Sequence, residues 1–151
     1  MKTLLVLSWI VMIVVSGCSG TRPANLGVTH GMLAPCPQAP HCVSSQSGNA
    51  SKRMEPFPYA SSKAEAREKL LTILRSMKRT QIIALEDAYL YAECRSAIFR
   101  YVDDVEFYID DEKKLIHYRS SSRLGYYDVG VNRRRMEKIR EMLDKSDFTL
   151  R

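Results

Sequence analysis

Four strand-like segments follow one another in the second half of the chain, and the connections between them are short. The segments are 81–86, 88–95, 97–109 and 114–122. An acidic Glu86-Asp87 turn separates the first two, and the polar segment 110–113 separates the last two. Because short connections join antiparallel neighbours, this pattern predicts a four-stranded antiparallel β-meander.

A helix is expected on each side of the meander. Ser62-Lys63-Ala64-Glu65 has the spacing of a capping box, and apolar residues then recur at helical spacing to about Arg79. A second helix is expected after segment 125–130, with Asn132 as its N-cap. The apolar residues expected to face the sheet are Ala66, Leu70, Ile73, Leu74, Met77, Met136, Ile139, Met142 and Leu143. The predicted fold class is α+β: an antiparallel four-stranded β-meander flanked by an N-terminal and a C-terminal helix.

The first 17 residues are typical of a signal peptide. Lys2 precedes Leu4 to Val15, an almost wholly apolar run that is too short to span a bilayer of about 30 Å. Residues 15–18, Val-Ser-Gly-Cys, resemble a bacterial lipobox, in which Cys18 is acylated and becomes the first residue of the mature chain. Ser19 at the next position resembles the outer-membrane sorting pattern. The alternative is an ordinary secretory signal with a coincidental cysteine.

The expected organisation has three parts: a lipoprotein signal peptide over residues 1–17, a membrane tether over 18–31, and a single α+β domain over 32–151. A length of 151 residues fits one domain with a sizeable core. Several acyl chains on Cys18 would hold the protein firmly at a membrane. We therefore expect a cell-envelope protein, anchored by lipid at the outer membrane and facing the periplasm.

The chain is basic, with 23 Lys and Arg against 17 Asp and Glu and a formal charge of +6. Binding to nucleic acid is not expected, because an exported protein is in the wrong compartment and the basic residues are not interleaved with an exposed aromatic platform. Anionic envelope lipid is a more accessible partner. The charges are also segregated: acids cluster between Asp103 and Glu112 and bases between Arg119 and Arg135.

The cysteines of an exported chain lie where disulfides persist. Cys36 and Cys42 flank a segment with two prolines, so a short disulfide loop worth about 2–3 kcal/mol is expected. The alternative is a metal site formed by these cysteines with His30 and His41, although no second Cys/His cluster with zinc-finger spacing follows. Cys94 lies in a strand pattern and is expected to be a buried thiol.

The third strand-like segment carries Asp103, Asp104 and Glu106. Alternation places Asp103 on the face of Phe99, Tyr101, Val105, Phe107 and Ile109, and places Asp104 and Glu106 with Arg100 on the other face. If the turn centres on Asp111-Glu112, the expected pairs are Asp104 with Arg119, Glu106 with His117, and Asp103 with Ser120. One hypothesis is a metal or acid/base site; the other is cross-strand ion pairing, worth about 0.2–1 kcal/mol per exposed pair. Opposite faces argue against chelation of one ion by Asp103 and Asp104.

Hydroxyls, glycines and guanidiniums concentrate between Arg119 and Arg135. Such groups beside a helix N-terminus can bind an anion, and three arginines at that N-terminus oppose the helix dipole. The candidate anion-binding residues are Arg119, Ser122, Arg123, Asn132 and Arg133. The alternative is internal pairing of the arginines with Asp128, Asp103, Asp104 and Glu137. The sequence shows neither a Ser-His-Asp triad nor a phosphate-binding P-loop.

Three motifs resemble one known family. They are Cys36-Pro37 through Pro40-His41-Cys42-Val43-Ser44-Ser45, then Phe99-Arg100-Tyr101-Val102-Asp103-Asp104-Val105-Glu106-Phe107, and Arg119-Ser120-Ser121-Ser122-Arg123-Leu124-Gly125 through Asp128-Val129-Gly130-Val131-Asn132-Arg133. From about Leu33 to Leu143, the chain resembles the domain-of-unknown-function family 1499. His41 departs from the family pattern, which usually has Asn there. The resemblance implies an envelope lipoprotein or membrane-associated protein, and it implies no reaction or cofactor.

We expect an envelope module that binds an anionic ligand or a protein partner through the Arg/Ser/Gly region, or that is purely structural. An enzyme is the less favoured expectation. The alternative enzymatic function is an envelope hydrolase using Asp103 or Asp104 with Arg123, which would require these groups to converge in one pocket. No catalytic residue, cofactor or metal is assigned from the sequence.

Overall fold

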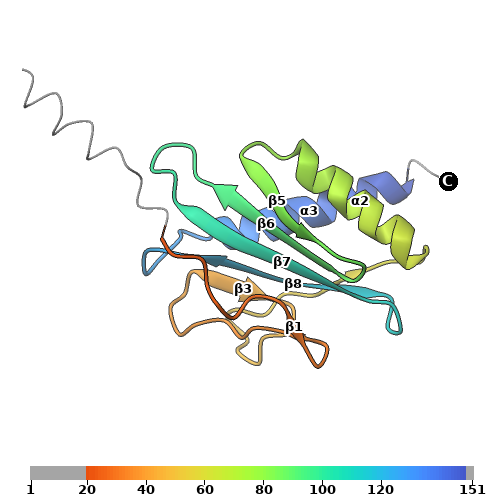
Figure 1. Cartoon of the computed structure of the whole chain (residues 1–151), viewed down its shortest axis with the longest axis horizontal. Coiled ribbons are helices and arrows are strands. Elements are labelled where there is room, and N and C mark those ends of the chain that lie inside the picture. The colour runs from red at the N-terminus through yellow and green to blue at the C-terminus, as the bar shows by residue number, and fades with distance from the viewer. Residues whose placement is uncertain (1–19, 149–151) are drawn as a thin grey trace, which may run out of the picture.

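The computed structural model describes residues 20–148 and has an α+β architecture (Figure 1). In chain order the elements are β1 (Val28–Thr29), β2 (Met32–Leu33), β3 (Cys42–Ser44), β4 (Phe57–Pro58), α2 (Lys63–Ser76), β5 (Thr80–Leu85), β6 (Tyr89–Arg95), β7 (Val102–Asp110), β8 (Leu115–Ser122) and α3 (Val131–Phe148). The predicted signal peptide and Cys18 lie outside the described residues. In the described part of the chain, no helix is long and apolar enough to cross a membrane.

The main sheet is larger than the sequence predicted. Strands β5, β6, β7 and β8 pair antiparallel in chain order, as a meander does, but the sheet has six strands because β3 and β4 both pair with the free edge of β8. A second, two-stranded sheet joins β1 to β2. The expectation of one four-stranded meander is therefore wrong. The added strands are two or three residues long in a proline-rich segment, so they lack the alternation that identifies a strand in a sequence.

The pairing of β7 with β8 differs by two residues from the expected register. Glu106 pairs with Arg119, Asp104 with Ser121 and Asp103 with Ser122. The reason is the turn, which covers residues 111–114. Asp110 Oδ1 accepts the Lys113 backbone N–H at 3.1 Å, and Lys114 takes φ 55°. The centre of the turn therefore lies one residue later than Asp111-Glu112, which moves every cross-strand partner by two.

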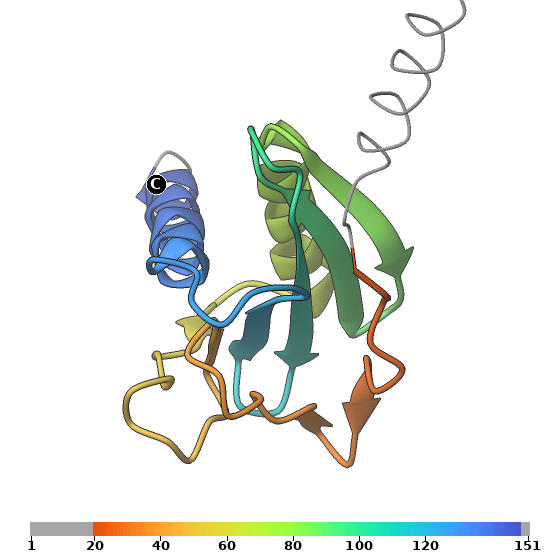
Figure 2. The same ribbon diagram turned by 90° about the vertical axis from the view of Figure 1, so that its left-hand side faces the viewer.

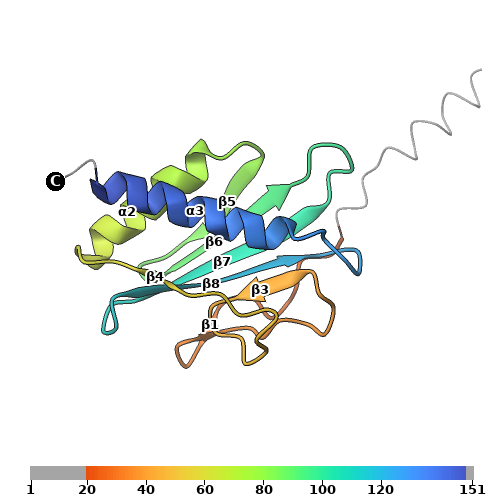
Figure 3. The same cartoon turned by 180° about the vertical axis from the view of Figure 1, so that it is seen from behind.

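Both helices pack on one face of the main sheet (Figures 1 and 3). The capping box of α2 is confirmed: Ser62 Oγ accepts the Glu65 N–H, and Glu65 accepts the Ser62 N–H. The core lies between this face and the helices, with buried side chains Ala66, Leu70, Leu71, Ile73, Leu74, Leu90, Val105, Phe107, Ile109, Ile116, Tyr118, Met136 and Ile139. The expected residues Met77, Met142 and Leu143 pack against it partly buried.

The start of α3 corrects a second expectation. Asn132 is inside the helix and fully buried, so it is not the N-cap. The carboxylate of Asp128 instead accepts the backbone N–H groups of Gly130 and Asn132, at 3.0 and 2.8 Å. Gly130 has φ 73°, a conformation that glycine adopts without steric cost. A carboxylate at this position offsets the arginines that follow at the helix N-terminus.

Strand β7 begins at Val102, five residues later than expected. Residues 96–101 form a hairpin loop in which Arg100 has φ 55°. Phe99 and Tyr101 therefore do not join the core face, and they are 69% and 44% exposed. Within the strand the predicted alternation is confirmed, because Val105, Phe107 and Ile109 are buried against the helices.

The opposite face of the sheet is covered in part by the N-terminal segment. Figure 2 shows the first described segment, residues 20–33, on one side of the sheet and the helices on the other. Leu33 packs there with Tyr89 and Tyr91, and Leu26 and Val28 border this smaller cluster. The Cys36–Cys42 disulfide, confirmed in the structure, closes the loop that leads into β3. The remaining described cysteine, Cys94, is a buried free thiol as expected, and burial raises its pKa.

Candidate functional site

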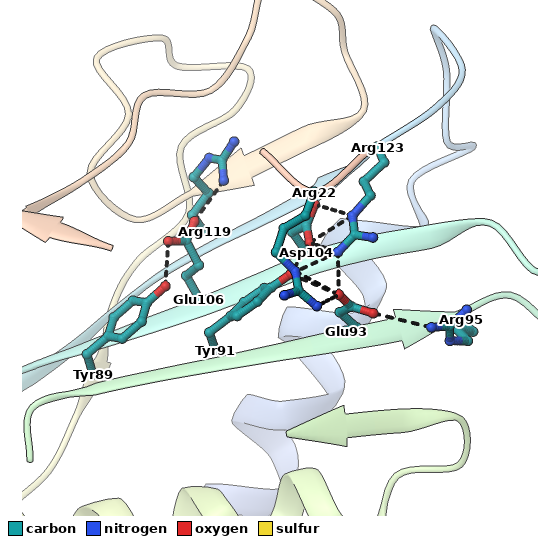
Figure 4. Close-up of polar contacts among 9 residues, drawn as sticks. All are labelled: Arg22, Tyr89, Tyr91, Glu93, Arg95, Asp104, Glu106, Arg119 and Arg123. Atoms are coloured by element: carbon teal, nitrogen blue, oxygen red, sulfur yellow. Dashed lines mark hydrogen bonds and ion pairs between the residues drawn. The ribbon is translucent and has the colours of Figure 1, made fainter. Parts of the chain in front are cut away.

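Charged side chains line the face of the sheet that the helices leave free. Alternation on β6 and β7 brings Tyr91, Glu93, Asp104 and Glu106 to this face, because Tyr91 pairs with Glu106 and Glu93 with Asp104. Figure 4 shows these groups meeting arginines from three parts of the chain. Buried carboxylates are costly without partners. The contacts of the arginines therefore determine which carboxylates of the cluster are paired within the protein.

Arg123 lies over the end of this cluster. Its Nε donates to both carboxylate oxygens of Asp104, at 3.1 and 2.9 Å, and its Nη2 donates to Asp104 Oδ1 at 2.7 Å. The same Nη2 donates to Glu93 Oε1 at 2.5 Å and to the Tyr91 hydroxyl at 2.9 Å. The hydrogen bond to Asp104 is the largest factor that raises the pKa of Arg123. This guanidinium is engaged by internal acceptors.

Glu93 is held by arginines on three sides. Arg22 Nη2 lies 2.5 Å from Glu93 Oε1, and Arg95 Nη2 lies 3.3 Å from Oε2 (Figure 4). Burial opposes ionisation of Glu93, but the hydrogen bonds from Arg22 and Arg123 outweigh it and lower the pKa to about 2. Burial and a hydrogen bond to Asp104 raise the pKa of Tyr91. The cluster therefore combines the ionised carboxylate of Glu93 with the neutral phenol of Tyr91 at ordinary pH.

A second ion pair lies further along the same face. Arg119 Nη1 donates to Glu106 Oε2 at 2.7 Å, and both side chains are almost fully buried. The other carboxylate oxygen, Oε1, accepts the Gly27 backbone N–H at 2.8 Å and the Tyr89 hydroxyl at 2.9 Å. Burial and the neighbouring Glu106 raise the pKa of Tyr89. Glu106 thus fastens the N-terminal segment to the sheet, and its oxygens are occupied.

On the helix side, Asp103 joins a separate network. Arg135 Nη2 donates to Asp103 Oδ2 at 2.5 Å, while its Nη1 donates to Ser120 Oγ and Asn132 Oδ1 at 3.0 and 2.6 Å. The Asn132 side-chain N–H groups donate to the His41 carbonyl, Ser122 Oγ and Asp128 Oδ2. Burial opposes ionisation of Asp128, but hydrogen bonds from Asn132 and Gly130 lower its pKa overall. These contacts tie the start of α3 to β8 and β7.

The hydrolase hypothesis combined Asp103 or Asp104 with Arg123, and the structure brings Asp104, not Asp103, to Arg123. Asp104 and Arg123 meet on one face, whereas Asp103 is on the other with Arg135. Of the candidate anion-binding residues, Ser122 and Asn132 lie together, and Arg119 and Arg123 are paired with carboxylates. Arg133 is apart from both groups and donates to the Ser51 carbonyl. The alternative of internal pairing describes Arg123 and its partner Asp104, whereas Arg119 pairs with Glu106, an acid that this alternative did not include.

A pocket of about 440 Å³ opens at the end of the sheet beside the start of α3. Its lining is part apolar and part polar: Ser96, Tyr101, Asp103, Ser122, Leu124, Gly125, Tyr127, Asp128 and Val131. Carboxylate and hydroxyl oxygens offer acceptors, and the aromatic rings offer apolar contact. Such a lining suits an amphiphilic ligand. In residues 20–148 no group of three or more His, Cys, Asp or Glu has the arrangement of a metal site.

Sequence reasoning missed several members of the charged cluster. Tyr89, Tyr91, Glu93 and Arg95 recur at every second position of β6, which is a signal that they share a face and meet Asp104 and Glu106 on the next strand. Arg22 gave no such signal, because it lies in a polar segment without periodicity. Its partner, Glu93, is 71 residues away in the chain.

Comparisons with known proteins place the chain in a family. A family model described as "Protein of unknown function (DUF1499)" matches residues 32–143. This span includes β2 to β8 and most of α3, and it contains both networks except Arg22 and Gly27. Neither the curated proteins nor the solved structures contain a match to the chain. The protein belongs to the DUF1499 family of proteins of unknown function.

Proposed function

We propose that the protein is a lipid-anchored cell-envelope protein whose domain is a binding module. Acylation of Cys18 would hold it at the outer membrane, facing the periplasm. The lipobox-like residues 15–18 support the anchor. The Cys36–Cys42 disulfide supports export, because disulfides persist in oxidising compartments.

The observation that carries the binding function is the contrast between the charged networks and the pocket. Arg119, Arg123 and Arg135 are each paired with a buried carboxylate, so these groups stabilise the sheet and the start of α3. The pocket beside them is open. It shares Asp103, Ser122 and Asp128 with the network at the start of α3, and the exposed rings of Tyr101 and Tyr127 complete its lining. Its chemistry suits an envelope amphiphile whose polar part carries hydrogen-bond donors.

The anchor is tested by mass spectrometry of the protein extracted from membranes. Acylation predicts that the mature chain begins at Cys18 and carries the mass of fatty acyl groups on that residue. The Cys18→Ala variant should lack this mass. An extracted chain that begins at another residue, or an unmodified Cys18, would refute the anchor.

The pocket is tested by native mass spectrometry of the same preparation. We expect a co-purifying small molecule with the unsubstituted protein and its loss from Tyr127→Ala, because Tyr127 lines the pocket and is largely exposed. The control is Leu85→Ala, which removes an exposed apolar side chain from β5, outside the pocket. Equal ligand retention by both variants would exclude the pocket as the site.

A further inference from the structure

Exposed apolar side chains gather in two loops of the molecule. The loop between β6 and β7 exposes Ile98, Phe99 and Tyr101, and the loop between β8 and α3 exposes Leu124, Tyr126 and Tyr127; we call these six residues the apolar tip. Ile98 and Tyr126 are 82% and 76% exposed. Val129 in the second loop and Val131 at the start of α3 are also exposed, and the other exposed large apolar residues of the described chain are Met32 and Leu85. A patch of this kind marks an interaction surface.

The two loops lie at the same end of the sheet (Figures 1 and 3). This follows from the antiparallel order, because the chain enters β7 at the end where it leaves β8. Arg123 N–H donates to the Val102 carbonyl at 3.0 Å, which joins the bases of the loops. Tyr101 from one loop and Leu124 and Tyr127 from the other line the same pocket. The apolar tip is therefore one surface.

The described chain begins beside the apolar tip. Gly20 has φ 66°, and a Cβ placed on it would lie 3.1 Å from Leu124 Cγ and 3.0 Å from Arg123 Cβ. Cys18, the proposed acylation site, precedes Gly20 by two residues. Two residues span at most about 7 Å. An acyl anchor at Cys18 therefore brings the bilayer surface close to Leu124 and its neighbours.

The charges around the apolar tip fit an anionic lipid surface. Arg100 lies in the first loop and Arg134 in the first turn of α3, and both are exposed. The turns at the other end of the sheet carry the exposed acids Glu86, Asp87, Asp111 and Glu112, and the exposed Lys113 and Lys114 there pair with Asp110 and Asp111. Basic residues near a membrane are attracted to anionic lipids, and tyrosine is enriched at the bilayer interface. The molecule thus presents a basic, aromatic end toward its anchor and a more acidic end away from it.

We infer that the apolar tip inserts into the interface of the bilayer that carries the anchor, and that the amphiphile proposed for the pocket is a lipid of that bilayer. This inference rests on the proposed acylation of Cys18. Phe99 and Ile98 contact the acyl region, Tyr126 and Tyr127 lie at the level of the headgroups, and the exposed arginines face lipid phosphates. The pocket then opens onto the membrane surface, where its polar lining meets headgroup donors.

Tryptophan fluorescence measures this insertion with little background. The only tryptophan of the chain is Trp9, which lies in the predicted signal peptide and is absent from a mature chain that begins at Cys18. Phe99→Trp and Tyr127→Trp place a single reporter in each loop of the apolar tip. Leu85→Trp is the matched control, because Leu85 is also an exposed apolar residue but lies near the opposite end of the sheet.

The full protein extracted from membranes is reconstituted into vesicles of phosphatidylethanolamine and phosphatidylglycerol with brominated acyl chains. We expect the emission of Phe99→Trp and Tyr127→Trp to shift to shorter wavelength and to be quenched several-fold more than that of Leu85→Trp. Unshifted and unquenched emission from both loop reporters in vesicle-bound, acylated protein would overturn the insertion and leave the anchor standing.

Failure of the anchor gives a different result. An unmodified Cys18 in mass spectrometry refutes acylation by itself. If the loop reporters are still quenched in such protein, the apolar tip binds bilayers without an anchor and the insertion is supported. If they are unquenched as well, both proposals are overturned.

Discussion

The carboxylate of Asp104 on β7 accepts three hydrogen bonds from Arg123, the residue that follows β8, at 2.7 to 3.1 Å, and the two side chains are 1% and 6% exposed. Removing one partner of a buried pair leaves the other charge without compensation. Arg123→Ala should therefore lower the free energy of unfolding by about 3–5 kcal/mol, measured by urea denaturation of the purified protein.

The control for this substitution is Arg134→Ala, which removes an exposed arginine 11 positions later in the chain and should cost about 0.5 kcal/mol or less. A double-mutant cycle with Asp104→Ala isolates the coupling between Asp104 and Arg123. Independent, additive losses in the two single variants would show that the pair does not act as a unit.

Acid should destabilise the protein through Glu93. Its pKa is about 2 in the folded protein against 4.5 for an unperturbed glutamate, so the folded state favours the ionised form. The resulting stability is present above about pH 4.5 and is lost as the pH falls toward 2. We expect its size to be on the order of 2 kcal/mol, because water screens the half-exposed Arg22. Equilibrium unfolding at a series of pH values measures this loss.

Glu93→Gln provides the comparison for the acid titration, because an amide does not ionise in this range. The variant should be less stable at pH 7 and should lose less stability than the unsubstituted protein between pH 4.5 and 2. Parallel curves for the two proteins would mean that another carboxylate controls the acid response.

Asp128 should stabilise the start of α3 through its contacts with Gly130 and Asn132. Asp128→Ala removes the acceptor for two backbone N–H groups and should cost about 1–2 kcal/mol of unfolding free energy, as loss of an N-terminal helix cap does. Asp87→Ala is the control, since that carboxylate lies in an exposed turn, where it pairs with Lys63. Equal stability of the two variants would contradict the capping function of Asp128.

The Cys36–Cys42 disulfide should contribute about 2 kcal/mol, because it closes a loop of few residues. Reduction of the purified protein should lower its resistance to urea by this amount. Cys36→Ala/Cys42→Ala is expected to show the lower stability already without reductant and to be unchanged by its addition. A full response of this double variant to reductant would mean that the effect comes from elsewhere.

The parts of the fold that the sequence predicted correctly have local causes. The Ser62 and Glu65 capping box, the alternation along β7 and the Cys36–Cys42 loop each depend on residues close together in the chain. Capping motifs, the periodicity of apolar side chains and short loops can be recognised from residues that are close together in the sequence. The general α+β class followed from these elements and their order.

The parts that the sequence missed depend on distant contacts or on turn geometry. Strand β3 exists because β8 offers it a free edge, and Arg22 belongs to the charged cluster because Glu93 lies beneath it. Because Lys114 takes φ 55° in the turn, the observed β7–β8 register differs by two residues from the one expected from the sequence. The residue types indicated that the arginines and acids between Asp103 and Arg135 form ion pairs or a binding site. Which acid pairs with which arginine depends on the strand register, which the sequence did not predict correctly.

The contacts of the N-terminal segment also have a mechanical consequence. A pull on the chain ahead of Gly20 reaches the Arg22–Glu93 ion pair first and then the hydrogen bond from Gly27 to Glu106, which are attached to β6 and β7. Tension on the N-terminal segment is therefore transmitted to β6 and β7 in the interior of the main sheet. With the proposed anchor at Cys18, a force between the membrane and the domain would therefore act on β6 and β7, the strands that hold Arg22 and Gly27.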